Sequence, residues 1–96
     1  MFYTPDSKRA LESDLQSDIL ELAQVRGWFA VKIESRSRRG MMDVYALRKG
    51  RHVWMEVKRA GEVPRPQQER VAREMRAQGA EVYAVDSIER AREILR

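Results

Sequence analysis

The chain has 96 residues, 43% of them hydrophobic and 35% charged, a balance that predicts one small folded domain over residues 1–96 and excludes a disordered chain. It has no cysteine and one histidine, His52, which excludes disulfide scaffolds, cysteine nucleophiles and zinc sites built on thiolates or several histidines. Lysine and arginine number 19 against 15 acidic residues, so the net charge of +4 favours polyanionic partners, with nucleic acid first among them.

The sequence also bears on location and assembly. No apolar run approaches the roughly 18 residues that span a bilayer, and the first residues lack the charged-then-apolar pattern of a signal sequence. We therefore expect a cytoplasmic protein without a membrane partner. A domain of this size buries only about 60–65% of its unfolded surface, so pairing with a second copy is one source of further burial.

The first predicted element is a helix that begins near Lys8, with Asp6 or Ser7 as its cap, and ends at Gly27. Its apolar residues recur at helical spacing: Leu11, Leu15, Ile19, Leu22 and Ala23. Glu12 lies three and seven residues before two members of this stripe, at its edge, so its carboxylate can face inward.

Strands are predicted next. The aromatic and β-branched run over 28–33 indicates a first strand, and the basic segment 35–40 indicates an exposed loop. Strands over 42–48 and 51–58 then form a hairpin through a turn at Lys49 and Gly50. Alternation on the second of these strands separates two faces, one bearing His52, Trp54, Glu56 and Lys58 and the other bearing Val53, Met55 and Val57.

The last part of the chain predicts a helix, a strand and a helix. The first helix begins near Pro66, carries an inward stripe of Gln68, Val71, Ala72 and Met75, and stops at Gly79. A strand over 81–85 follows, and Asp86 with Glu89 resembles a capping box that starts a terminal helix ending at Arg96. The order is αβββαβα, with the final strand parallel to its neighbour, which predicts an α/β fold with a mixed four-stranded sheet flanked by helices.

Three polar residues of the hairpin point to chemistry. Antiparallel pairing across the turn brings Asp43 close to Glu56 and Lys58. Two carboxylates, together with the backbone carbonyl of Val57, suit a hard cation such as Mg²⁺. Lys58 can then orient or deprotonate a nucleophile, or stabilise charge on a phosphate, which predicts phosphodiester hydrolysis. The competing interpretation is a surface ion pair between Glu56 and Lys58, worth about 0–1 kcal/mol.

In these residues the sequence resembles the PD-(D/E)XK nuclease superfamily and, within it, the VRR-NUC family. The blocks that carry the resemblance are Arg39-Gly40-Met41-Met42-Asp43, Trp54-Met55-Glu56-Val57-Lys58, Pro66-Gln67-Gln68 and the segment 79–85. The resemblance implies a restriction-endonuclease-like αβββαβ core, Mg²⁺ or Mn²⁺ dependence and cleavage of branched or flapped DNA. It also implies a stand-alone domain of the phage and bacterial type, which forms a homodimer.

The resemblance assigns roles residue by residue. Asp43 and Glu56 match the metal-binding acids, Lys58 the catalytic lysine, Gln68 the glutamine on the following helix and Glu12 the acid on the first helix. The family usually has proline directly before the aspartate, where this chain has Met42.

Gln67 and Gln68 compete for the glutamine role, and periodicity favours Gln68 because it shares the inward stripe of its helix. The alternative is that Gln68 only satisfies a backbone group near the start of that helix.

Basic residues flank the predicted metal site and can neutralise phosphates on both sides of a scissile bond: Lys32, Arg36, Arg38, Arg39, Arg59 and Arg65. The alternative is a solvated charged surface. No helix that enters a DNA groove accompanies these residues, so we expect recognition of DNA structure rather than of base sequence. His52 is expected to be a surface residue, and for Trp28 and Trp54 a role as core or dimer anchors is favoured over base stacking.

The leading hypothesis is a metal-dependent, structure-selective DNA endonuclease that acts as a homodimer on four-way junctions, whose two-fold symmetry a dimer matches. The first alternative is a DNA-binding or architectural module that keeps the fold but has lost activity. The second is a structural subunit that uses its sheet for assembly. Five residues are expected to contribute to the dimer contact: Phe2, Tyr3, Trp28, Ile94 and Leu95.

Overall fold

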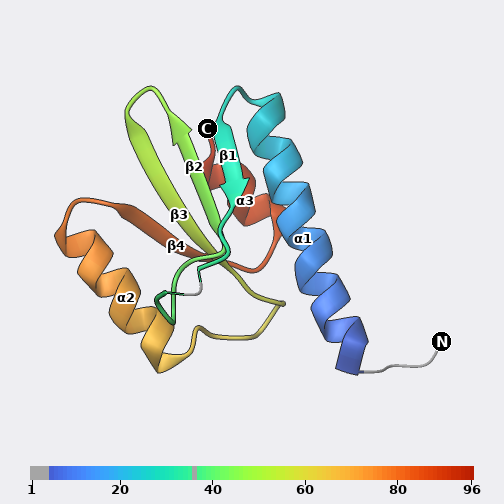
Figure 1. Cartoon of the computed structure of the whole chain (residues 1–96). Coiled ribbons are helices and arrows are strands. Elements are labelled where there is room, and N and C mark those ends of the chain that lie inside the picture. The colour runs from blue at the N-terminus through green and yellow to red at the C-terminus, as the bar shows by residue number, and fades with distance from the viewer. Residues whose placement is uncertain (1–4, 36) are drawn as a thin grey trace.

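A four-stranded sheet organises the computed structural model, which describes residues 5–35 and 37–96 (Figure 1). The elements follow the predicted order: α1 (Pro5–Val25), β1 (Phe29–Lys32), β2 (Val44–Arg48), β3 (Arg51–Val57), α2 (Pro66–Ala77), β4 (Glu81–Val85) and α3 (Ile88–Ile94). The sheet has the strand order β1-β2-β3-β4, with β3 and β4 parallel and the other pairs antiparallel. The predicted mixed α/β architecture is therefore confirmed.

The β2–β3 hairpin forms where the sequence predicts it. Lys49 and Gly50 both have positive φ angles, 47° and 82°, which is the backbone twist that a two-residue hairpin turn requires. This turn sets the pairing of Val44 with Met55 at the far end of the hairpin. The segments just beyond that pair, which carry Asp43 and Glu56, are held side by side as a consequence.

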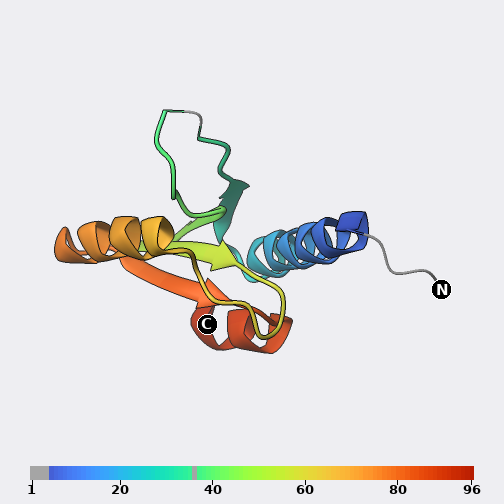
Figure 2. The same cartoon turned by 90° about the horizontal axis from the view of Figure 1, so that it is seen from below.

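Helices cover the two faces of the sheet unequally. The larger core lies between the sheet and the helices α1 and α3, and its fully buried residues include Ile19, Val44, Val53 and Met55. On the other face, α2 packs on β4 through Val71, Ala72 and Val82, together with Met42. Figure 2 shows α2 on one side of the sheet, away from α1 and α3.

The three residues of the expected dimer contact that the structure describes belong instead to this larger core. Trp28 is 4% exposed, Ile94 is 6% exposed and Leu95 is fully buried. The expectation for them is wrong, because α3 folds back onto the sheet and encloses these side chains within the chain. Phe2 and Tyr3 lie outside the described residues.

Two helices, the first and the last, have boundaries that differ from their predicted positions. The first helix begins at Pro5, because proline fits the first helical turn without the loss of a hydrogen bond. The terminal helix is capped by Ser87 rather than Asp86, with the Ser87 hydroxyl accepting the backbone N–H of Arg90 at 3.2 Å, and it ends at Ile94. None of the helices described here has the length and apolar character needed to cross a bilayer.

Candidate active site

Asp43 and Glu56 lie together where β2 begins and β3 ends. The backbone N–H of Asp43 donates to the carbonyl of Met55 at 2.9 Å, which extends the ladder one residue beyond β2. The Asp43 carboxylate in turn accepts the backbone N–H of Val57 at 2.8 Å. These two bonds fix the aspartate against the segment that carries Glu56 and Lys58, as the hairpin register predicts.

Glu56 is a buried carboxylate whose negative charge is only partly balanced by its neighbours. Its side chain is 4% exposed, and its Oε1 lies 3.3 Å from the Nζ of Lys58. Its Oε2 is buried without a hydrogen-bond partner. Burial, followed by the nearby negative charge of Asp43, raises the pKa of Glu56 to about 7, against the attraction of Lys58. Glu56 with Lys58 is therefore a buried pair, unlike the exposed ion pair that was the alternative.

The pKa of Asp43 is raised as well, mainly because burial disfavours its charged form. The hydrogen bond from Val57 and the charges of Lys58 and Lys32 act in the opposite direction. Two desolvated carboxylates next to each other repel, and a divalent cation would relieve that repulsion.

The unpaired Oε2 of Glu56, beside the carboxylate of Asp43, is an oxygen whose negative charge a bound cation would compensate. Asp43, Glu56 and the carbonyl of Val57 are the oxygen donors that the sequence predicts for it. No group of three or more Asp, Glu, His or Cys side chains suited to a metal occurs within residues 5–35 and 37–96. A hard cation held by two carboxylates would keep several waters, as Mg²⁺ does in proteins.

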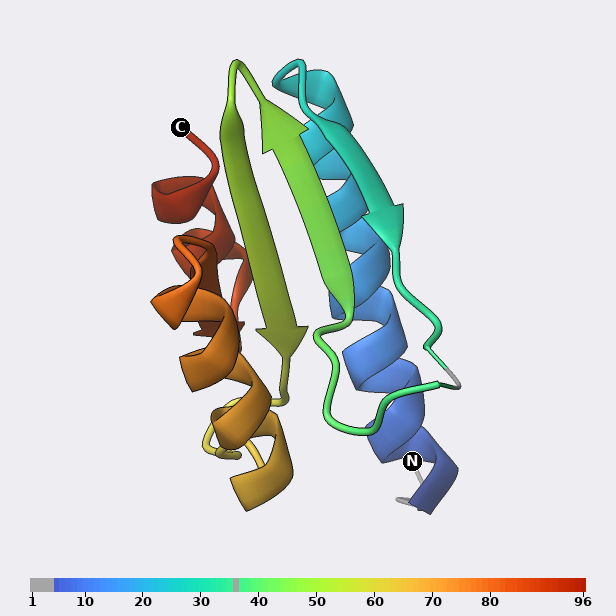
Figure 3. The ribbon, with the colours of Figure 1, turned by 60° about the vertical axis from the view of Figure 1, so that its left-hand side comes forward.

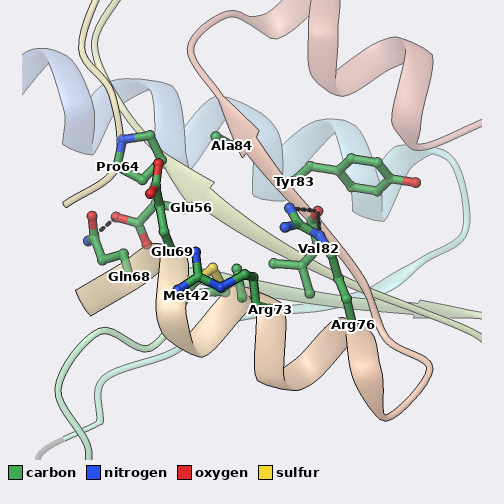
Figure 4. A pocket seen from close by; sticks show the side chains of 11 residues that line it. Met42, Glu56, Pro64, Gln68, Glu69, Arg73, Arg76, Val82, Tyr83 and Ala84 are labelled. Carbon is green, nitrogen blue, oxygen red and sulfur yellow. Dashed lines mark hydrogen bonds between the residues drawn. The ribbon is translucent and has the colours of Figure 1, made fainter. Parts of the chain in front are cut away.

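Gln68 contacts both the buried glutamate and the backbone at the start of its own helix. Its side-chain amide donates to Oε1 of Glu56 at 2.5 Å, from the first turn of α2 (Figure 4). Its side-chain carbonyl accepts the backbone N–H of Arg65 at 2.9 Å, at the start of the same helix. Gln68 thus ties the beginning of α2 to the buried glutamate, whereas Gln67 is exposed.

Glu12 reaches the edge of the same cluster from α1. Burial raises its pKa, and Glu62 adds to this through a hydrogen bond and its negative charge, while the charge of Lys58 lowers it. Sequence analysis missed Glu62, which follows β3 in an irregular segment without periodicity. Its pKa is lowered chiefly by a hydrogen bond from Arg59, whose Nε lies 2.8 Å from Oε1 of Glu62.

The predicted basic residues divide into two groups. Lys32, whose Nζ lies 3.7 Å from Oε1 of the exposed Glu34, is close enough to lower the pKa of Asp43, and Arg39 and Arg65 are exposed near the start of α2. Arg59 is bound to Glu62, and Arg38 is bound to Glu74 of α2. Arg36 lies outside the described residues.

Two further arginines line a pocket that opens beside Glu56, between α2 and β4, with a volume of about 400 Å³ (Figure 4). Arg76 donates to the carbonyl of Val82 at 2.7 Å, and Arg73 is exposed one turn earlier. Their sequence signal is a three-residue spacing of arginines along 70–76, which places them on one side of a helix.

No protein-family model and no curated protein sequence matches the chain. A solved structure described as a VRR_NUC domain superposes with a TM-score of 0.79 and 25% sequence identity. The superposition covers 88% of this chain and 94% of the other, so the similarity includes nearly every element described above.

Proposed function

This chain belongs to the VRR-NUC family of nucleases, and from that premise we propose that it is a Mg²⁺- or Mn²⁺-dependent endonuclease that hydrolyses branched DNA. The observation that carries the proposal is the buried carboxylate of Glu56, held between Lys58 and Gln68 with one oxygen unpaired. A second desolvated carboxylate, Asp43, repels Glu56 and would destabilise an ion pair whose role was only structural.

The proposed cation would be held by Asp43, Glu56 and the carbonyl of Val57. The chemistry that it supplies when bound is polarisation of a phosphate oxygen and acidification of water. Lys58 stabilises negative charge on the phosphate or orients the attacking water, because its ammonium group is held at the carboxylates. Gln68 positions Glu56, and Glu12 at the edge of the cluster takes the role that the resemblance implies for the acid on the first helix.

Contacts to the DNA backbone are assigned to the exposed cations around this cluster, Lys32, Arg39, Arg65 and Arg73. Contacts to the DNA backbone do not depend on the base sequence, which agrees with recognition of branched structure. For a four-way junction, two copies related by a two-fold axis would supply the two symmetric cuts.

The test is cleavage of a labelled panel of linear, flapped, splayed and four-way DNAs with Mg²⁺, Mn²⁺ or EDTA. We expect cleavage of the branched substrates with either cation and none in EDTA. Asp43→Ala, Glu56→Ala and Lys58→Ala should each lower the rate by roughly 100-fold or more, since each removes a group that acts in the transition state.

Asp14→Asn is the matched control, because it removes an exposed carboxylate from the outer side of α1. Circular dichroism and thermal melting of every variant separate lost chemistry from lost folding. Addition of Mg²⁺ should raise the melting temperature of the wild type and leave that of Asp43→Ala unchanged. Metal-independent DNA binding without cleavage of any substrate would favour the inactive DNA-binding module instead.

A further inference from the structure

The sheet face that α2 leaves open is apolar and aromatic. Register and alternation assign six side chains to it: Phe29, Val31, Tyr45, Leu47, His52 and Trp54. Figure 3 looks onto this face, with α1 behind the sheet and α2 at one side. Phe29 is 60% exposed and Val31 is 36% exposed. The open face of an antiparallel sheet is usually polar, so an exposed apolar face of this kind indicates a binding surface.

The aromatic residues continue the face that carries the carboxylates. Tyr45 lies two positions after Asp43, and Trp54 lies two positions before Glu56, so each aromatic ring is about 7 Å along its strand from a carboxylate. Tyr45 and Trp54 are paired directly across the hairpin, with ring centroids 4.6 Å apart. A DNA strand whose phosphate lies at the carboxylates would therefore bring its neighbouring base onto this pair of rings.

The surroundings of Trp54 suit a flat, uncharged group attached to a phosphate. The half-buried ring packs on one side against the smaller core of α2 and lines a groove of about 340 Å³ there, together with Met41 and Met75. Arg38 and Glu74, which pair with each other, stand at the rim of this groove. None of the six side chains is itself a carboxylate, and Glu74 at the rim is paired with Arg38. The carboxylates that continue the face are those of the proposed cation site, Asp43 and Glu56.

We propose that this open face binds unpaired nucleobases of the strand being cut, stacked on Tyr45 and Trp54. Stacking on aromatic side chains is tolerant of sequence and selects unpaired over paired bases. The inference deepens the proposed nuclease function and rests on it, because it names the single-stranded part of a branched DNA as the feature recognised. A second copy of the chain is the competing occupant, but it would cover the strip beside Asp43 and Glu56 that the substrate must reach.

The test measures binding in EDTA, where cleavage does not interfere. The probes are a short thymidine oligonucleotide and an abasic oligonucleotide of equal length, which carries the same phosphates without bases. The wild type should bind the thymidine probe roughly 10-fold more tightly and show quenching of tryptophan fluorescence. Tyr45→Leu and Trp54→Leu, singly and together, should reduce that preference and leave binding of the abasic probe unchanged.

Leucine keeps the face apolar, so these variants separate stacking from simple hydrophobic contact. Trp54→Phe should retain most of the preference, because it keeps a ring. Val25→Ala is the control, because it shortens an exposed apolar side chain on α1 rather than on the open face, and it should leave the preference unchanged.

Equal binding of the two probes by the wild type would overturn the inference. It would also be overturned if the variant with both leucine substitutions kept the full preference for the thymidine probe over the abasic probe. The inference would also be overturned if the leucine variants had a lower mass than the wild type by light scattering but kept its preference for the thymidine probe. That result would identify the face as an interface between copies. Cleavage of the DNA panel is scored separately. An inactive wild type that still prefers bases would contradict the nuclease function alone, and an active one without preference would contradict only the stacking.

Discussion

At the scale of single residues, the central feature is a glutamate that folding moves into an unfavourable environment. Glu56 is 3% exposed and faces a second carboxylate, while Lys58 and Gln68 compensate only one of its oxygens. A buried charge with incomplete partners destabilises the folded state. Such an arrangement is typical of a site whose chemistry requires it, since a purely structural position would favour an apolar residue.

This environment predicts a pH-dependent stability in the absence of divalent cations. Because folding raises the pKa of Glu56 from 4.5 to about 7, the folded state binds the proton more tightly than the unfolded state does. The resulting stability is present below about pH 4.5, declines as the pH rises and is lost above about pH 7. We expect Glu56→Gln to be more stable than the wild type at pH 8 by up to about 3 kcal/mol.

Urea unfolding of both proteins in EDTA across this pH range measures the difference. The difference should shrink as the pH falls, since protonated Glu56 and glutamine are both neutral. A constant difference between the two proteins across the range would contradict the pKa assigned to Glu56.

At the scale of elements, the connection between β1 and β2 determines how α2 approaches the site. Gly40 in this connection has a φ of 82°, and a Cβ atom there would lie 2.8 Å from the backbone oxygen of Gln67. The next residue of α2, Gln68, carries the hydrogen bond to Glu56. Gly40 therefore makes its close contact with Gln67, the neighbour of the residue that positions the buried carboxylate.

We therefore expect Gly40→Ala to impair both folding and cleavage. A left-handed backbone costs a residue with a Cβ about 1–2 kcal/mol, and here the methyl group must also displace the backbone of α2. Gly79→Ala is the matched control, with a φ of 95° and nothing within 4 Å of an added Cβ. Urea unfolding and cleavage rate should show a larger stability loss for Gly40→Ala, and a loss of activity in that variant alone. Equal effects of the two substitutions would mean that the contact with Gln67 does not position the site.

At the scale of the whole molecule, one cluster of carboxylates serves one scissile phosphate. Symmetric cleavage of a four-way junction requires two such clusters at a fixed separation, which a two-fold homodimer provides. Trp28, Ile94 and Leu95 cannot contribute to its interface because the chain buries them itself. The proposed dimer would therefore use surface that remains exposed after α1 and α3 have closed the larger core.

Light scattering at micromolar concentration tests this assembly, with an expected mass of about twice 11.3 kDa. Mixing wild type with an excess of Asp43→Ala should convert paired cuts of a junction into single-strand nicks, because mixed dimers hold one active cluster. A monomeric mass accompanied by paired cuts at the wild-type rate would refute the dimer.

Sequence patterning by itself determined the features that depend on neighbours along the chain. The Lys49-Gly50 turn and the two-residue period of the flanking strands are local, and together they bring Asp43 against Glu56 and Lys58. The helical stripe that includes Gln68 is local too, so its inward direction was predictable. The order of elements and the mixed sheet followed from the same periodicities.

Only the tertiary structure decided what depends on which element covers which surface. It encloses Trp28, Ile94 and Leu95 in the larger core. It leaves Trp54 half-buried at the edge of the smaller core, because α2 packs on β4 rather than across the sheet. It also brings Glu62, from an irregular segment, to Glu12 of α1. Burial and long-range contacts of this kind leave no periodic pattern in the sequence, because they arise from the packing of residues that are far apart along the chain.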